Sequence, residues 1–210
     1  MQNVLSIIFC FTIFYLAVTM RVKTYVTLMR YQGLLLTLML LLPLLHGAPL
    51  VSYILPLALF AIKVILIPRY MNRIIRDLDI NRVIEPTIQQ ITFLLLVIGS
   101  MTVIFIASDY LSHLTQIQTI PFATGFTAVI VGSFIVIFRR KLIVHVAGFL
   151  VLENGLFLVS VSVGTDMPIM IELGTLLDVF VVIFLMGIAM NRIRSTLSGF
   201  DVTALGRLKD

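Results

Sequence analysis

The segment that decides the fold is PTIQQITFLLLVIGSMTVIFIAS at residues 86–108, which contains no Asp, Glu, Lys or Arg. A helix of about 20 apolar residues crosses the hydrocarbon core of a bilayer. Three more runs without a charged residue occupy residues 1–20, 31–62 and 110–138. Of the 210 residues, 60% are apolar and 12% are charged, and the mean hydropathy is +1.13. Soluble domains contain about 25% charged residues, so the sequence predicts a multi-pass membrane protein.

Clusters of charged, proline and glycine residues divide the chain into seven apolar segments. We therefore expect an all-α polytopic protein with about seven transmembrane helices, at residues 3–20, 28–45, 50–68, 87–107, 120–138, 142–163 and 168–190. The mixed-charge connection at residues 69–86 is too short to form a soluble core. It is expected to be a solvated interfacial helix or a docking segment for a partner.

The distribution of basic residues predicts the orientation in the membrane. By the positive-inside rule, loops rich in Lys and Arg face the cytoplasm. The loops that alternate with them carry His46, Asp109, His113 and Asp166 and no Lys or Arg, so the N-terminus is expected outside and the C-terminus in the cytoplasm. Fourteen of the 15 basic residues fall on the cytoplasmic side: Arg21, Lys23, Arg30, Arg69, Arg73, Arg76, Arg82, Arg139, Arg140, Lys141, Arg192, Arg194, Arg207 and Lys209.

Two carboxylates are expected near the middle of the bilayer. Glu153 and Asp178 lie at matching distances from the short turn between the sixth and seventh segments, so both are placed about 15 Å from that turn. Gly174 and Thr175 precede Asp178 by one helical turn and permit close helix approach. A carboxyl group in apolar surroundings can be neutral and exchange protons when water or a base reaches it. The alternative is that each acid only fixes helix packing.

Three further ionisable residues lie within or near the ends of the apolar segments. Lys63 can extend its ammonium group to the nearby membrane interface, or it can pair with an intramembrane carboxylate. Glu172 and His145 lie about one turn from the ends of their helices, where either exposure to water or a role in proton entry or exit is expected. The candidate proton pathway therefore consists of Glu153, Asp178, Lys63, Glu172 and His145.

Other chemistries find little support in the sequence. The single cysteine, Cys10, excludes an intrachain disulfide, a thiolate zinc site and an iron–sulfur cluster built from this chain. The three histidines have no metal-ligand spacing, and no nucleophile elbow, P-loop or dinucleotide fingerprint occurs. The net charge of +5 is explained by basic cytoplasmic loops rather than by nucleic-acid binding. We expect no catalytic residue in this chain.

Several short motifs occur in a fixed order and carry a family resemblance. They are RRKL at residues 139–142, Gly148, Glu153-Asn154-Gly155, Asp178, NRIR at residues 191–194 and the tail FDVTALGRLK at residues 200–209. In this order they resemble the last two helices of the NuoK family of complex I, whose relative in antiporter complexes is MrpC. With AIKVILIP at residues 61–68 and LENG at residues 152–155, essentially the whole chain resembles hydrogenase-4 component E (HyfE).

This resemblance implies a noncatalytic membrane-arm subunit of a group 4 [NiFe]-hydrogenase or related complex I-like respiratory complex in the cytoplasmic membrane. It implies contacts with antiporter-like membrane subunits and lipid, and a [NiFe] centre and iron–sulfur clusters in partner subunits, with no cofactor in this chain. Neither nucleic acid nor a small-molecule substrate is expected. It divides the chain into a four-helix region at residues 1–119, a NuoK-like three-helix unit at residues 120–194 and a cytoplasmic tail at residues 195–210.

The chain departs from the NuoK pattern at both carboxylate positions. That pattern has its first carboxylate two residues after the glycine, where this chain has Leu150, and Glu153 follows about one turn later. The second carboxylate is Asp178 rather than Glu. Two functions are therefore kept: a proton-translocating subunit, and a structural linker between antiporter-like subunits. A stand-alone small transporter is disfavoured because the sequence shows no evident inverted repeat.

Overall fold

The computed structural model describes residues 1–44, 49–77, 84, 87–115 and 117–163, and the isolated positions 174, 181, 184 and 187. This part of the chain is helical and contains no β-strand. Four short helical elements follow one another in the middle of the sequence: η1 (Leu50–Tyr53), α3 (Ile54–Leu59), the π-helix η2 (Phe60–Leu66) and α4 (Ile67–Asp77). The long helices are α1 (Gln2–Val18), α2 (Val22–Leu44), α5 (Gln90–Ser112), α6 (Thr119–Phe138) and α7 (Leu142–Val163).

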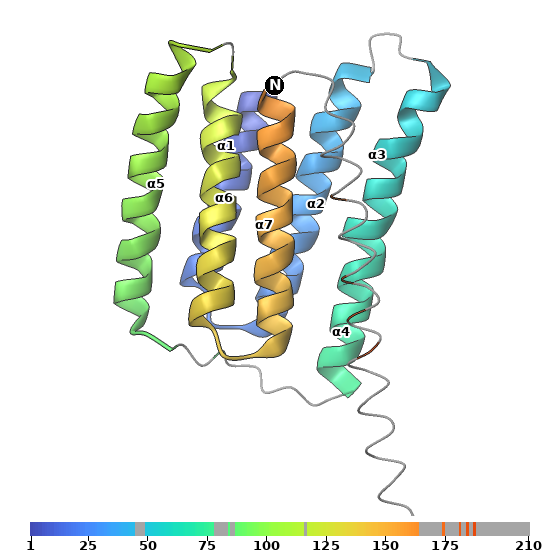
Figure 1. Ribbon diagram of the computed structural model, residues 1–210. Helices are drawn as coiled ribbons and strands as arrows, with labels where there is room; N and C mark the ends of the chain where they lie inside the picture. The colour runs from blue at the N-terminus through green and yellow to red at the C-terminus, as the bar shows by residue number, and fades with distance from the viewer. Residues whose placement is uncertain are drawn as a thin grey trace, which may run out of the picture.

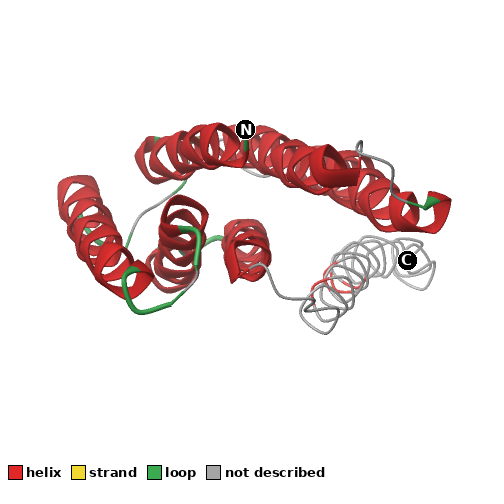
Figure 2. Ribbon diagram, turned by 90° about the horizontal axis from the view of Figure 1, so that it is seen from above, coloured by secondary structure: helices red, strands yellow, loops and turns green. Residues whose placement is uncertain are grey.

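The helices stand side by side in two rows (Figures 1 and 2). One row contains α1, α2 and the continuous α3–η2–α4 rod, and the other contains α5, α6 and α7. The rows meet where α1 packs on α6 and α2 packs on α7. Five helical segments within the described residues are long and apolar enough to cross a membrane, and their outer faces expose large apolar side chains such as Leu57 and Ile91. The chain is a multi-pass membrane protein.

The expected helices at residues 120–138 and 142–163 coincide with α6 and α7 within a residue. The expected helix at residues 3–20 corresponds to α1, which ends at Val18, and the one at residues 87–107 corresponds to α5, which is shifted to Gln90–Ser112. Of the expected seventh helix, only positions 174, 181, 184 and 187 are described, and each is helical. The rest of that segment lies outside the described residues.

The expected start of the second helix at residue 28 is wrong, because α2 begins at Val22. Lys23 and Arg30 were assigned to a loop, but both lie within α2 and are exposed. The opposite face carries buried Val22, Val26 and Met29 at helical spacing, and this burial stabilises the first turns of the helix despite the charges.

The expected end of the third helix at residue 68 is also wrong. The rod continues through α4 to Asp77, although Pro68 removes a backbone donor. The buried side chains Met71, Ile74 and Ile75 have the spacing of one helix face, whereas Arg69 on the other side is exposed. Apolar burial along this face therefore continues the rod into the connection where a solvated interfacial helix was expected.

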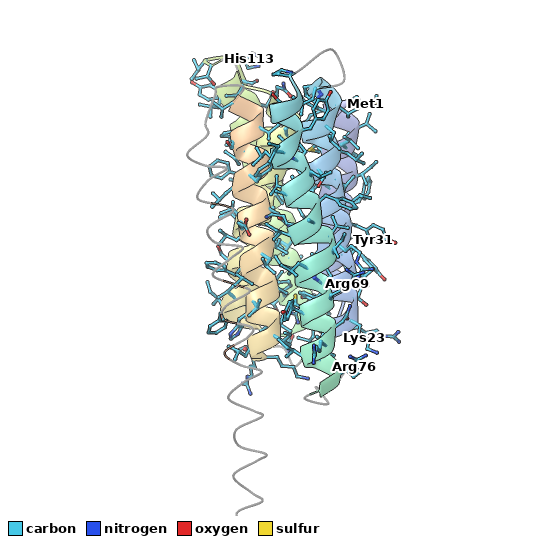
Figure 3. All side chains as sticks on the ribbon, turned by 90° about the vertical axis from the view of Figure 1, so that its right-hand side faces the viewer. Met1, Lys23, Tyr31, Arg69, Arg76 and His113 are labelled. Atoms are coloured by element: carbon cyan, nitrogen blue, oxygen red, sulfur yellow. The ribbon has the colours of Figure 1, made fainter. Side chains whose placement is uncertain are left out.

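Opposite ends of the bundle carry different residues. Met1 and His113 lie at one end, and Lys23 and Arg76 lie at the other (Figure 3). Arg139 was expected in a cytoplasmic loop; it is the C-cap of α6, and its side chain is only 2% exposed. Its guanidinium group donates to Gln90 Oε1 at 3.1 Å and lies 4.6 Å from the ring centroid of Phe93. Arg139 therefore joins the C-terminus of α6 to the N-terminus of α5.

The closest helix pair is α6 and α7, whose backbones touch at glycines. A Cβ atom built on Gly132 would lie 2.6 Å from the backbone nitrogen of Leu152, and one on Gly155 would lie 2.6 Å from the carbonyl oxygen of Gly125. Residues seven apart share one face of a helix, so Gly125 and Gly132 face Gly155 and Gly148 across the contact. This contact fixes the rotation of α7 about its axis, and thereby the direction of the neighbouring Glu153 side chain.

Candidate functional site

Lys63 lies in the middle of the π-helix η2. Turns of π-helix are rare and occur frequently at functional sites. The side chain is 6% exposed and points into the bundle. The alternative that Lys63 reaches the membrane interface is therefore wrong, and its partner belongs to the same chain.

That partner is Glu153, which lies halfway along α7, about 16 Å from either end of the helix. Lys63 Nζ lies 2.7 Å from Glu153 Oε1, and the carboxylate residue is 3% exposed. Withdrawing two charges from water costs several kcal/mol per ion, and their attraction offsets this only with close geometry and further hydrogen bonds. The pair is therefore sensitive to the loss of either partner.

Hydrogen bonds from the pair connect four helical elements, η2, α7, α2 and α1. Lys63 Nζ also donates to Asn154 Oδ1 at 2.8 Å, and Asn154 Nδ2 donates to Gln32 Oε1 of α2 at 3.2 Å. Gln32 Nε2 then donates to Thr12 Oγ1 of α1 at 3.1 Å. The two rows of helices are thus joined by one polar chain, formed by Glu153, Lys63, Asn154, Gln32 and Thr12.

The hydrogen-bond donors of the polar chain from Lys63 to Thr12 all point in one direction, from η2 toward α1. Starting from the Lys63 ammonium, each amide accepts at its oxygen and donates from its nitrogen, and Thr12 Oγ1 finally donates to the Phe9 carbonyl at 2.6 Å. An ammonium group can only donate, so Lys63 fixes the orientation of Asn154 and, through it, of Gln32. The charge on Lys63 therefore orders the polar chain as far as α1.

Two glycines create space around the pair. A Cβ atom on Gly33 of α2 would lie 2.9 Å from Lys63 Cβ, so α2 can approach η2 this closely only without a side chain there. A Cβ atom on Gly174 would lie 3.3 Å from Glu153 Oε1. The position one turn before Asp178 therefore lies against the Glu153 carboxylate. Asp178 itself lies outside the described residues.

One further candidate, His145, lies away from this cluster. His145 lies in the first turn of α7, about 12 Å along the helix from Glu153. Its Nε2 atom is hydrogen-bonded to the carbonyl oxygen of Arg139, at the end of the bundle. Glu172 lies outside the described residues. Among those that are described, no three His, Cys, Asp or Glu side chains are placed to hold a metal ion.

Sequence reasoning missed Gln32, Thr12 and Gly33. A signal for Gln32 was available, because a polar amide followed by a glycine stands near the start of the uncharged run at residues 31–62. A buried amide in that environment requires hydrogen-bond partners. Thr12 carried no such signal, because a threonine hydroxyl in a helix can bond to its own backbone.

Comparison with known proteins finds a distant relative and does not assign the chain to a family. An uncharacterized protein of Mycobacterium tuberculosis (strain ATCC 25618 / H37Rv), Rv0085, is 25% identical over 158 residues, which cover 73% of this chain and 71% of that protein. No protein-family model matches the sequence. No solved structure matches the chain.

Proposed function

We propose that this chain is a noncatalytic membrane-arm subunit of a complex I-like respiratory complex or a membrane-bound hydrogenase of the cytoplasmic membrane, and that Lys63 and Glu153 form a proton-exchanging pair in its translocation path. The observation that carries this proposal is the buried Lys63–Glu153 contact of 2.7 Å, halfway along α7. Ionisable residues within a membrane are costly to insert and commonly mark ion pathways and proton relays.

The contact distance permits direct proton transfer between the two side chains. With the proton on Lys63 the pair is ionic, and with the proton on Glu153 both groups are neutral. An ion pair in apolar surroundings costs more free energy than the same pair in water, which narrows the difference between the two forms. A neighbouring charge that enters or leaves this region therefore shifts the equilibrium between the two forms. Gly174 lies against the carboxylate, so residue 178, one turn further on, is the expected next acid.

The amide part of the polar chain has a different role. The side chains of Asn154 and Gln32 have no titratable proton, so they orient Lys63 rather than carry protons. This observation favours the alternative function, a structural linker, for the α1–α2 half of the cluster. In that alternative the whole cluster only fixes the positions of η2 and α7, and the subunit joins antiporter-like neighbours without carrying protons.

Isolation from native membranes in mild detergent tests the assignment to a complex. We expect a tagged full-length chain to co-purify with antiporter-like membrane subunits and with subunits that carry a [NiFe] centre and iron–sulfur clusters. Isolation of the chain alone, from membranes in which such a complex is assembled and active, would contradict the proposal and would favour a separate small transporter.

A further inference from the structure

One arginine of α2 lies close to the middle level of the bundle. Arg30 stands just before Gln32, so the two positions are about 3 Å apart along the helix axis. Gln32 is hydrogen-bonded to Asn154, which lies about 18 Å from the N-terminus of α7, near the middle of that helix. Since α2 and α7 are both long and apolar enough to cross a membrane, the backbone of Arg30 lies at the level of the hydrocarbon core.

The Arg30 side chain faces outward. It is exposed, as are Thr27 and Leu34, which lie one turn before and after it on the same helix face. Figure 3 shows the adjacent Tyr31 projecting from the surface of the bundle. Within the described part of the chain, the guanidinium group of Arg30 forms no ion pair and no hydrogen bond. Its positive charge is therefore presented to the surroundings of the bundle rather than to its interior.

An exposed charge at this level is costly in a bilayer. The hydrocarbon core is about 30 Å thick, so its edge lies about 12 Å from the backbone of Arg30. Charged side chains within membrane segments almost always face the bundle interior or pair with one another. Arg69 of α4, also exposed, lies about 9 Å beyond Lys63 toward the end of the bundle and can extend to the interface from there. Arg30 lies too deep for this and requires an opposite charge at its own level.

Neither lipid phosphate nor the described surface of a second copy supplies that charge. Phosphate groups lie outside the hydrocarbon core, beyond the reach of an arginine about 12 Å inside it. Among the acids whose side chains the structure describes, Asp109 lies near the C-terminal end of α5, and Glu153 is buried against Lys63. A transmembrane helix of another protein, with an Asp or Glu near its middle, has the required charge at the required level.

We propose that the outer face of α2 binds a transmembrane helix of a partner protein, and that Arg30 forms an ion pair with a carboxylate near the middle of that helix. The same face continues as Leu34 and Leu38, which are 37% and 39% exposed and suit an otherwise apolar helix. The inference rests on the proposed function only in requiring a membrane partner. It does not depend on proton exchange by Lys63 and Glu153.

Photocrosslinking in native membranes identifies what covers this face. The photoreactive amino acid p-benzoylphenylalanine replaces Thr27 or Leu34 in the full-length chain, and Val103, 66% exposed on α5, is the matched control position. We expect both α2 positions to crosslink to the same membrane protein, which has an Asp or Glu in the middle of a transmembrane segment. The Val103 position is expected not to give this product.

Charge reversal tests the ion pair. Arg30→Glu is expected to lower the crosslink yield at Leu34, per molecule of chain in the membrane, at least about tenfold, because it places like charges together. Arg30→Lys should retain most of the yield, since it keeps the positive charge. Lys23→Glu is the matched control, because Lys23 is exposed on the same helix at the end of the bundle (Figure 3), and it should change the yield less than about twofold.

A reciprocal exchange of charges excludes misfolding as the cause of the loss. Changing the partner's carboxylate to arginine in the Arg30→Glu background should restore the yield to within about threefold of the wild-type value. Adducts with lipid alone, with a second copy or with another segment of this chain would overturn the proposal, and so would a yield unchanged by Arg30→Glu. The class of the crosslinked protein is scored separately, so a partner outside any hydrogenase or complex I-like assembly would support this inference while contradicting the proposed function.

Discussion

The ammonium group of Lys63 lies 2.7 Å from the carboxylate of Glu153, although the two residues are 90 positions apart in the sequence. Their contact joins the two rows of helices halfway along α7. Both side chains are almost completely buried. The polar chain that starts from this contact also orients residues of α2 and α1, so changes at the pair affect both stability and the proposed proton transfer.

Lys63→Met is expected to reduce the stability of the folded protein by about 3–5 kcal/mol, because it leaves the Glu153 carboxylate buried without its positive partner. The double variant Lys63→Met/Glu153→Gln removes both charges and should recover at least half of this loss. Thermal or denaturant unfolding in detergent measures the coupling between the two sites. If the stability loss of the double variant equals the sum of the losses of Lys63→Met and Glu153→Gln measured singly, the two residues do not stabilise each other.

Gly132→Ala is expected to destabilise the protein by about 1–3 kcal/mol, because its Cβ atom would meet the Leu152 backbone nitrogen at 2.6 Å and separate α6 from α7. Gly99→Ala in α5 is the matched control, since a Cβ atom there meets nothing within 4 Å. Replacing this helical glycine by alanine should leave stability unchanged or raise it by up to about 1 kcal/mol. Equal effects of the two substitutions in the same unfolding assay would contradict the proposed close contact.

Gln32→Leu tests whether the amides of the polar chain orient Lys63 without carrying protons themselves. Loss of the amide leaves polar groups of Asn154 and Thr12 without their Gln32 partner, so a stability loss of about 1–3 kcal/mol is expected. Proton translocation per electron should fall much less than with Glu153→Gln, because the amide carries no titratable proton. A complete loss of translocation in an assembled Gln32→Leu complex would show that the path passes through α2.

The expected orientation can be tested with single cysteines in a Cys10→Ser background. His113→Cys and Lys23→Cys lie at opposite ends of the bundle, and both positions are exposed (Figure 3). An impermeant thiol reagent added to intact cells should label position 113 and leave position 23 unlabelled until the membrane is opened. The reverse labelling pattern would invert the orientation that the basic residues predict.

The sequence predicted the position of Glu153 halfway along its helix, because the helix ends and the helix rise alone determine it. It did not identify the partner of Lys63, since that contact depends on the rotation of α7, on the closeness of α2 at Gly33 and on the π-helix around Lys63. Local residue patterns do not encode these three-dimensional properties. The start of the second helix and the end of the third helix were misplaced for a related reason: exposed charges were read as helix ends, although a buried apolar face on the other side continued the helix.

The most direct test of the proposed proton exchange uses Glu153→Gln in the assembled complex, reconstituted into sealed vesicles. Protons translocated per electron are measured together with the rate of electron transfer. Glutamine retains hydrogen bonding but has no titratable proton, so the complex should assemble and transfer electrons while the proton yield per electron falls. An unchanged proton yield in the fully assembled Glu153→Gln complex would contradict the relay and leave Lys63 and Glu153 as a structural link between the helix rows.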